Sequence, residues 1–142
     1  MRNRRAAIGL GLGLGLAIAV LAGIGASAVA RSGDPFEVAI SIRYSQFSPA
    51  IVSVPVGRPV TFVFTNGDPI DHEWIVGDAA SHERHRTGTE PIHDARPTEV
   101  SIPAGTVRRT TLTFSAIGSQ RFICHLPGHE AYGMAGTVVI TP

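Results

Sequence analysis

Short stretches in which hydrophobic and polar residues alternate run through most of the chain after residue 35. The alternation is clearest in residues 36–44, where Val38, Ile40 and Ile42 fall on one face. A period of two is typical of a strand with one buried face. Similar stretches, separated by turn-forming Gly, Pro, Asn and Asp, predict further strands at residues 51–54, 60–65, 72–77, 98–102, 106–114, 119–124 and 136–141. Seven or eight short strands with turns between them predict an all-β sandwich.

One long segment, residues 78–97, has neither this alternation nor an amphipathic helical pattern. At about 20 residues it exceeds the usual loop, so we expect it to be functional, partly helical or mobile. It contains His82, His85 and His93, and two interpretations stay open: a plain polar loop, or a second, labile metal site. The run around His82 and His85 is one residue too short for the His-Glu-x-x-His motif of zinc proteases.

The first thirty residues differ from the rest. Arg2, Arg4 and Arg5 precede an apolar run over residues 6–30 that ends in small residues. This order predicts a secretory signal peptide. The alternative is an uncleaved membrane anchor, because about 20 apolar residues suffice to cross a bilayer. With the positive end kept inside, both alternatives place a single domain, residues 31–142, outside the cytoplasm, in the periplasm or the extracellular space.

Charge and cysteine content exclude some functions and suggest others. The chain carries 12 basic and 11 acidic side chains, and every basic one is an arginine. The nine arginines that follow Arg5 are scattered, so no basic surface for nucleic acid is expected. Cys124 is the only cysteine. An odd cysteine in an exported protein indicates an intermolecular bridge, a reactive thiol or a metal ligand.

The segment that joins the last two predicted strands carries the chemistry. It offers a thiolate, an imidazole and a thioether five residues apart, at Cys124, His129 and Met134. Copper that cycles between Cu(I) and Cu(II) is bound by two histidines and one cysteine, with a weak axial methionine. His72, which follows a turn at the start of a strand, is well placed to supply the second histidine. Structural zinc sites use cysteine and histidine without thioether, so Met134 favours copper.

The Cys-x4-His-x4-Met pattern, with Pro127-Gly128 before the histidine and a glycine before the methionine, resembles the ligand loop of cupredoxins, in particular rusticyanin-like and plastocyanin/azurin-like proteins. The resemblance implies a Greek-key β-sandwich with one type 1 (blue) copper ion at one end, held by His72, Cys124, His129 and Met134. It also implies electron transport. Many members of the family have Asn, Ser or Thr after the first histidine, which ties the two ligand loops together. Here that residue is Glu73, whose carboxylate would donate electron density to copper or point to solvent.

Two functions follow from this pattern. The first is an exported carrier of single electrons between extracytoplasmic redox partner proteins, with a partner surface formed by Leu126, Pro127, Tyr132 and Ala135. The alternative is a copper-scavenging, storage or delivery module that uses the same site together with the histidine-rich segment. An enzyme is not expected, because no nucleophile or second positioned base accompanies the loop. His125 should point away from the copper, because neighbouring strand residues face opposite sides.

Overall fold

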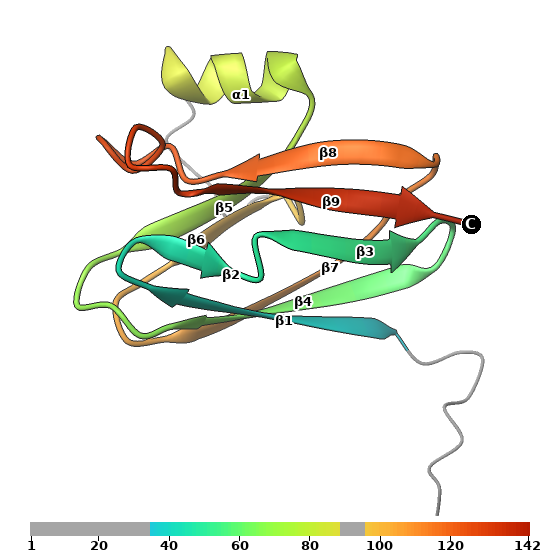
Figure 1. The fold of residues 1–142 in the computed structure, drawn as a ribbon, viewed down its shortest axis with the longest axis horizontal. Helices are drawn as coiled ribbons and strands as arrows, with labels where there is room; N and C mark the ends of the chain where they lie inside the picture. The colour runs from blue at the N-terminus through green and yellow to red at the C-terminus, as the bar shows by residue number, and fades with distance from the viewer. Residues whose placement is uncertain (1–34, 89–95) are drawn as a thin grey trace, which may run out of the picture. The chain divides into compact units, whose positions relative to one another are not determined.

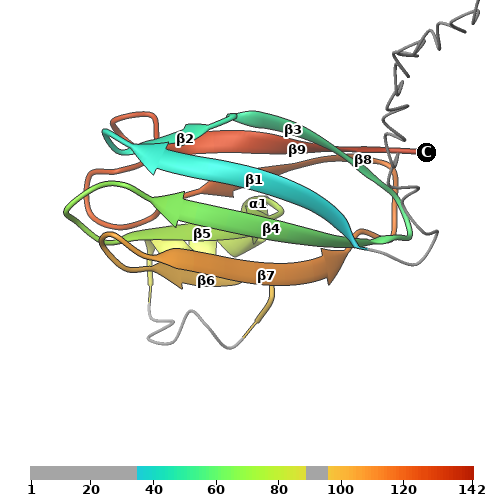
Figure 2. The same cartoon turned by 90° about the horizontal axis from the view of Figure 1, so that it is seen from below.

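The computed structural model describes residues 35–88 and 96–142, and these form a sandwich of two β-sheets with one short helix (Figures 1 and 2). One sheet has the order β2-β1-β4-β7 and the other β3-β9-β8-β5-β6. The strands are β1 (Phe36–Arg43), β2 (Gln46–Ser48), β3 (Ile51–Pro55), β4 (Pro59–Asn66), β5 (His72–Gly77), β6 (Glu99–Ile102), β7 (Val107–Thr113), β8 (Gly118–Ile123) and β9 (Ala135–Thr141). The all-β sandwich predicted from the alternation is therefore confirmed.

Two parallel strand pairs fix the register of the sheets. β1 pairs with β4, with Ile40 opposite Phe64, and β3 pairs with β9, with Val52 opposite Val138. The remaining pairs are antiparallel. Every second residue of β1, Val38, Ile40 and Ile42, is buried, as expected from a strand with one face on the core.

Aromatic side chains from both sheets meet in the centre of the sandwich. Trp74 of β5 is fully buried, and its ring centroid lies 4.9 Å from that of Phe62 and 5.1 Å from that of Phe64, both on β4. Phe122 of β8 lies 6.0 Å from Trp74 on the other side. Because β4 belongs to one sheet and β5 to the other, Trp74 packs between the two layers and joins them.

The structure adds two elements to the predicted strands. The segment after β5, for which a partly helical structure was one expectation, forms the helix α1 (Ala79–Arg86), which lies outside the five-stranded sheet in Figure 1. Hydrophobic periodicity could not reveal it, because its sequence, AASHERHR, has no apolar stripe, and its buried side chain is His82. The three-residue strand β2 was also not predicted. Residues 89–95, including His93, lie outside the described residues. Among the described residues, no helix has the length and apolar character needed to cross a membrane.

Candidate metal centre

The loops at one end of the sandwich bring together the predicted ligands. His72 begins β5 directly after the β4–β5 loop, whereas Cys124 and His129 belong to the loop between β8 and β9. These loops lie at the left end of Figures 1 and 2, away from the C-terminus. Residues far apart in the sequence thus meet because the strands that carry them end at the same edge.

The donor atoms of three predicted ligands form one compact group. The ligand atoms of His72, Cys124 and His129 all lie within 4.8 Å of one another. The Nδ1 atoms of the two histidines are 3.2 Å apart, and Cys124 Sγ lies 3.2 Å from His129 Nδ1. Two imidazoles and one sulfur are the donor set of a type 1 copper site, so the residues present fit copper. His72 and Cys124 are buried, and His129 is the half-buried member of the group.

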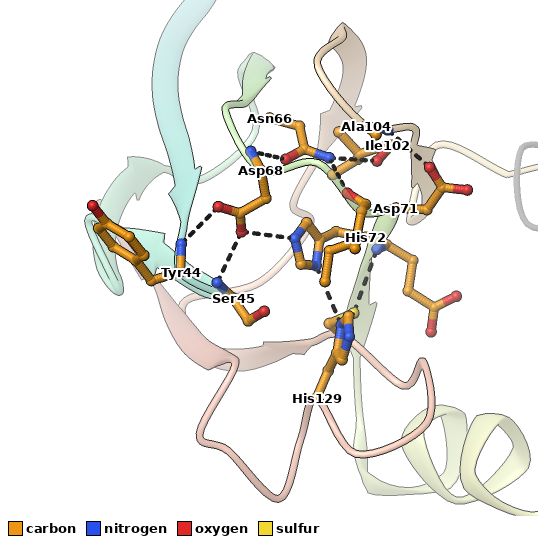
Figure 3. Close-up of polar contacts among 12 residues, drawn as sticks. Tyr44, Ser45, Asn66, Asp68, Asp71, His72, Ile102, Ala104 and His129 are labelled. Carbon is orange, nitrogen blue, oxygen red and sulfur yellow. Dashed lines mark hydrogen bonds and ion pairs between the residues drawn. The ribbon is translucent and has the colours of Figure 1, made fainter.

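A carboxylate sets the tautomer of His72. Its Nε2 lies 3.0 Å from Asp68 Oδ2, as Figure 3 shows. An ionised carboxylate only accepts hydrogen bonds, so Nε2 carries the hydrogen and Nδ1 keeps its lone pair for a metal. Metal-binding histidines usually donate their other N–H to such a partner.

Asp68 is itself held in place by main-chain donors. Its Oδ1 accepts from Tyr44 N at 2.7 Å and its Oδ2 from Ser45 N at 2.8 Å. Burial raises the pKa of Asp68, but these two hydrogen bonds and the contact with His72 outweigh it and hold the pKa below its ordinary value. Asp68 therefore stays ionised at neutral pH and links the β1–β2 turn to the first ligand.

The buried Asn66 side chain stabilises the same β4–β5 loop through hydrogen bonds to main-chain atoms. Its Oδ1 accepts from Asp68 N at 2.9 Å, and its Nδ2 donates to the carbonyls of Ile70 and Ile102 at 2.9 and 3.0 Å (Figure 3). The sequence showed only that a turn precedes His72, and it did not reveal the role of Asp68. The spacing of a carboxylate four residues before a metal-binding histidine is the signal that could have found it.

The second ligand loop folds back on itself and brings the main chains of its three predicted ligands together. Met134 N donates to His129 O at 3.0 Å, and Cys124 N donates to Met134 O at 3.1 Å. Gly128 and Gly133, directly before the second histidine and the methionine, both have φ of +86°. Residues with a Cβ rarely adopt this conformation, so the two glycines allow the turns that direct the following ligands inward. Met134 is fully buried.

The Cys124 side chain is shielded from solvent, which keeps its thiol protonated. It is fully buried, and burial raises its pKa to about 11, against a hydrogen bond from Glu73 N to Sγ of 3.5 Å. The thiol is therefore protonated at neutral pH, and metal binding includes the loss of this proton.

Glu73 ties the two ligand loops together. Its side chain is buried, which shows that the expectation of a carboxylate pointing to solvent is wrong. Its Oε1 accepts a hydrogen bond of 2.8 Å from His125 N, the residue after Cys124. A longer acidic side chain thus performs the linking role that Asn, Ser or Thr has in many cupredoxins.

We expect the Glu73→Ala substitution to destabilise the protein by about 1–3 kcal/mol, because the N–H of His125 would lose its acceptor in a buried site. Glu73→Gln keeps a side-chain oxygen at that position and should cost less than Glu73→Ala. Chemical denaturation of the metal-free proteins checks both values. Equal losses for the two variants would show that the hydrogen bond is not what Glu73 contributes.

The other histidines of the described chain, His82, His85 and His125, lie together and are not among the three donors. The His125 ring is directed to α1, where it contacts His82 and His85, and its side chain is 3% exposed. The prediction that His125 points away from the copper ligands agrees with this placement. Glu130 of the ligand loop forms an ion pair with Arg86 of α1, with an Oε1–Nη2 distance of 2.7 Å. The helix is thus attached to the ligand loop by its polar side chains.

Comparison with known proteins identifies a family. Residues 36–141 match the family of copper-binding proteins that comprises plastocyanin and azurin. Two similar proteins are copper-resistant cuproproteins CopI. That of Rubrivivax gelatinosus is 34% identical over 118 residues, which cover 78% of this chain and 72% of the relative. That of Pseudomonas aeruginosa is 26% identical, over 80% of this chain and 79% of the relative.

Solved structures of auracyanins share the fold. Auracyanin B superposes with a TM-score of 0.64 at 23% identity, covering 82% of this chain and 96% of that one. Dithionite-reduced auracyanin from Roseiflexus castenholzii gives the same TM-score and identity over 78% of this chain and all of that one. At this level of identity the likeness bears on the fold alone, and it supports the cupredoxin-like sandwich.

Proposed function

The chain belongs to the plastocyanin/azurin family of copper-binding proteins, and from this premise we propose that it holds one copper ion through His72, Cys124, His129 and Met134 and carries single electrons. The observation that carries the proposal is the compact group of two imidazoles and one sulfur, within 4.8 Å of one another, at the end of a rigid sandwich. When bound, copper supplies a one-electron couple.

The protein's own residues support this task by restricting movement. Asp68 fixes the ring of His72 through a 3.0 Å hydrogen bond, and Glu73 joins the main chains of the two ligand loops. Ligands that keep one arrangement in both oxidation states need little reorganisation when an electron arrives or leaves. Because His72 and Cys124 are buried, a substrate could approach the site only past the half-buried His129, and we expect no catalysed reaction there.

The half-buried His129 is the ligand through which we expect electrons to pass. Around it lie the residues predicted to meet a partner, of which Tyr132 is 78% exposed. Pro127 is also exposed, whereas Leu126 and Ala135 are half-buried. An apolar surface around one histidine fits a redox partner protein in the periplasm or the extracellular space, which is where we propose that the chain works.

We expect Tyr132→Glu to slow electron exchange with the partner about tenfold, on the scale of electrostatic effects on association. Ile117→Glu is the matched control, because Ile117 is 62% exposed and lies in the β7–β8 loop, at the other end of β8. Stopped-flow measurement of electron exchange with the redox partner, or with another small cupredoxin as the reductant, compares the rates of the two variants. A Tyr132 variant as fast as the Ile117 variant would place the partner surface elsewhere.

A second candidate function is copper scavenging, storage or delivery. The observation in its favour is that the similar CopI proteins are named for copper resistance. The two functions differ in what happens on reduction, because a carrier keeps its ion through many cycles and a donor gives up Cu(I).

The test loads the full chain with one equivalent of copper and cycles it with ascorbate and ferricyanide in the presence of a Cu(I) chelator. A carrier retains the metal and its visible spectrum after repeated cycles. Transfer of the copper to the chelator in the first reduction would instead support delivery and contradict the carrier.

A further inference from the structure

A second pair of imidazoles lies next to the candidate copper centre and takes no part in it. Nδ1 of His82, on α1, lies 3.0 Å from Nε2 of His125, which follows Cys124 in the sequence. The ring centroids are 5.2 Å apart. His82 is 3% exposed, and so is the side chain of His125. Two histidine nitrogens therefore face each other at close range in a site shielded from solvent.

The hydrogen-bond partners determine which nitrogen carries a hydrogen. His82 Nε2 lies 3.2 Å from the carbonyl oxygen of Arg121, which only accepts, so Nε2 carries the hydrogen and Nδ1 a lone pair. In neutral rings, the hydrogen between the two histidines then belongs to His125 Nε2. His125 Nδ1 is left with a lone pair, 3.3 Å from Glu130 Oε2.

This arrangement is unfavourable at one point. Among the residues that the structure describes, the buried His125 Nδ1 has no hydrogen-bond partner, and the electron-rich carboxylate oxygen of Glu130 lies 3.3 Å from it. A neutral His125 avoids this conflict only if its hydrogen moves to Nδ1, and lone pairs of the two rings then face each other. A neutral imidazole with a free lone pair is the form in which histidine binds metals.

We propose that His82 Nδ1 and His125 Nε2 are the ligands of a second transition-metal cation, Cu(II) by preference. On binding, the hydrogen on His125 Nε2 is exchanged for one on Nδ1, so both rings stay neutral and no net proton is released. His125 Nδ1–H then donates to Glu130 Oε2, while His82 Nε2–H keeps the Arg121 carbonyl. A carbonyl and a carboxylate are the outer partners that metal-binding histidines usually have.

The candidate copper centre contains the same arrangement. There the facing nitrogens of His72 and His129 are 3.2 Å apart, and the far nitrogen of His72 meets the Asp68 carboxylate at 3.0 Å. Metal–nitrogen bonds of about 2.0–2.1 Å place two ligand nitrogens about 3 Å apart when they meet near a right angle. The 3.0 Å between His82 Nδ1 and His125 Nε2 satisfies this distance requirement.

Neighbouring residues support the two histidines, and a cavity gives metal ions access to the site. His85 stacks on His125 with ring centroids 5.7 Å apart, and its own nitrogens face Ser81 O at 2.8 Å and Glu99 Oε1 at 3.8 Å, so it supports His125 and is not a ligand. A cavity lined by Arg86, His125, Leu126, Gly128, Glu130 and Ala131 reaches His125, one member of the pair, from outside. Imidazole donors favour Cu(II) among divalent metals, and water entering from this cavity would complete the coordination of the ion.

The second site does not depend on whether the first site carries electrons or delivers copper. The test measures the two sites separately. The full chain is titrated with Cu(II) while the visible and electron paramagnetic resonance spectra are recorded. We expect two equivalents to bind: one with the intense thiolate absorption, and one with a paramagnetic signal from nitrogen donors and no such absorption. Binding of a single equivalent would overturn the proposal and leave the first site intact.

Substitutions on α1 and in the ligand loop locate the second ion. His82→Gln should weaken the second equivalent more than about 100-fold, beyond the 10–100-fold typical of an outer-partner loss, with the thiolate absorption unchanged. Glu130→Gln should weaken it about tenfold. His85→Gln, the matched control, should bind both equivalents. Wild-type affinity in His82→Gln, or loss in His85→Gln alone, would contradict the assignment; an unchanged thiolate absorption shows that each variant is folded.

Discussion

The Gly136→Ala substitution is expected to lower the free energy of unfolding of the metal-free protein by about 3 kcal/mol, the upper part of the range for overpacked sites. A Cβ on Gly136 would overlap the ring of Phe122 and the carbonyl oxygen of Ala50. Neither can give way easily. Phe122 is fully buried between Phe47 and Trp74, and the Ala50 carbonyl accepts a 2.8 Å hydrogen bond from Thr137 N.

Gly67→Ala is the matched control for this prediction. A Cβ on Gly67 would meet only the end of the exposed, flexible Arg43 side chain, so its cost should stay within about 0.5 kcal/mol. Urea denaturation followed by Trp74 fluorescence gives both values. Similar stabilities for Gly136→Ala and the wild type would show that the close approach of β9 to β8 and the Ala50 main chain is not a requirement of the fold.

The Asp68→Ala substitution is expected to weaken copper binding about 10–100-fold, the usual cost of losing an outer partner of a metal-binding histidine. Without the carboxylate, His72 Nε2 loses its acceptor, and the ring is free to rotate or to place its hydrogen on Nδ1. Competition with a copper chelator measures the affinity. Asp68→Asn keeps a side-chain oxygen and should recover part of the loss.

Asp71→Ala provides the comparison for Asp68→Ala. Asp71 lies in the same loop and also accepts a main-chain hydrogen bond, from Ala104 N at 2.8 Å, without a contact to His72 through its side chain. Its copper affinity should remain close to that of the wild type. If both variants bound copper equally, the orientation of His72 would have to come from the packing of the ring and not from Asp68.

The predictable part of the molecule is the part with a regular pattern. Strands such as β1 and β4 were predicted within a residue or two because alternate side chains enter one core. The ligand loop was predictable because Cys124, His129 and Met134 are close in sequence, and soft donors at that spacing select few metals. His72 was found by its place after a turn.

What the sequence did not reveal depends on contacts between distant segments. The carboxylate of Asp68 was assigned only to a turn, and Glu73 was expected to reach solvent or to alter the metal, because nothing local shows that His125 N lies beside it. Helix α1 has no apolar stripe and is attached to the sandwich by polar side chains. The contact between His82 of α1 and His125, 43 positions later in the sequence, forms because α1 and β8 lie side by side in the fold.

The central claim is that Cys124 and two histidines form a copper site, and one comparison tests it most directly. The full chain and its Cys124→Ala variant are loaded with one equivalent of Cu(II), and their visible and electron paramagnetic resonance spectra are recorded together. We predict an intense blue or green absorption in the wild type that vanishes in the variant. A pale spectrum that the substitution leaves unchanged would place the copper on histidines alone and contradict the electron-carrier account.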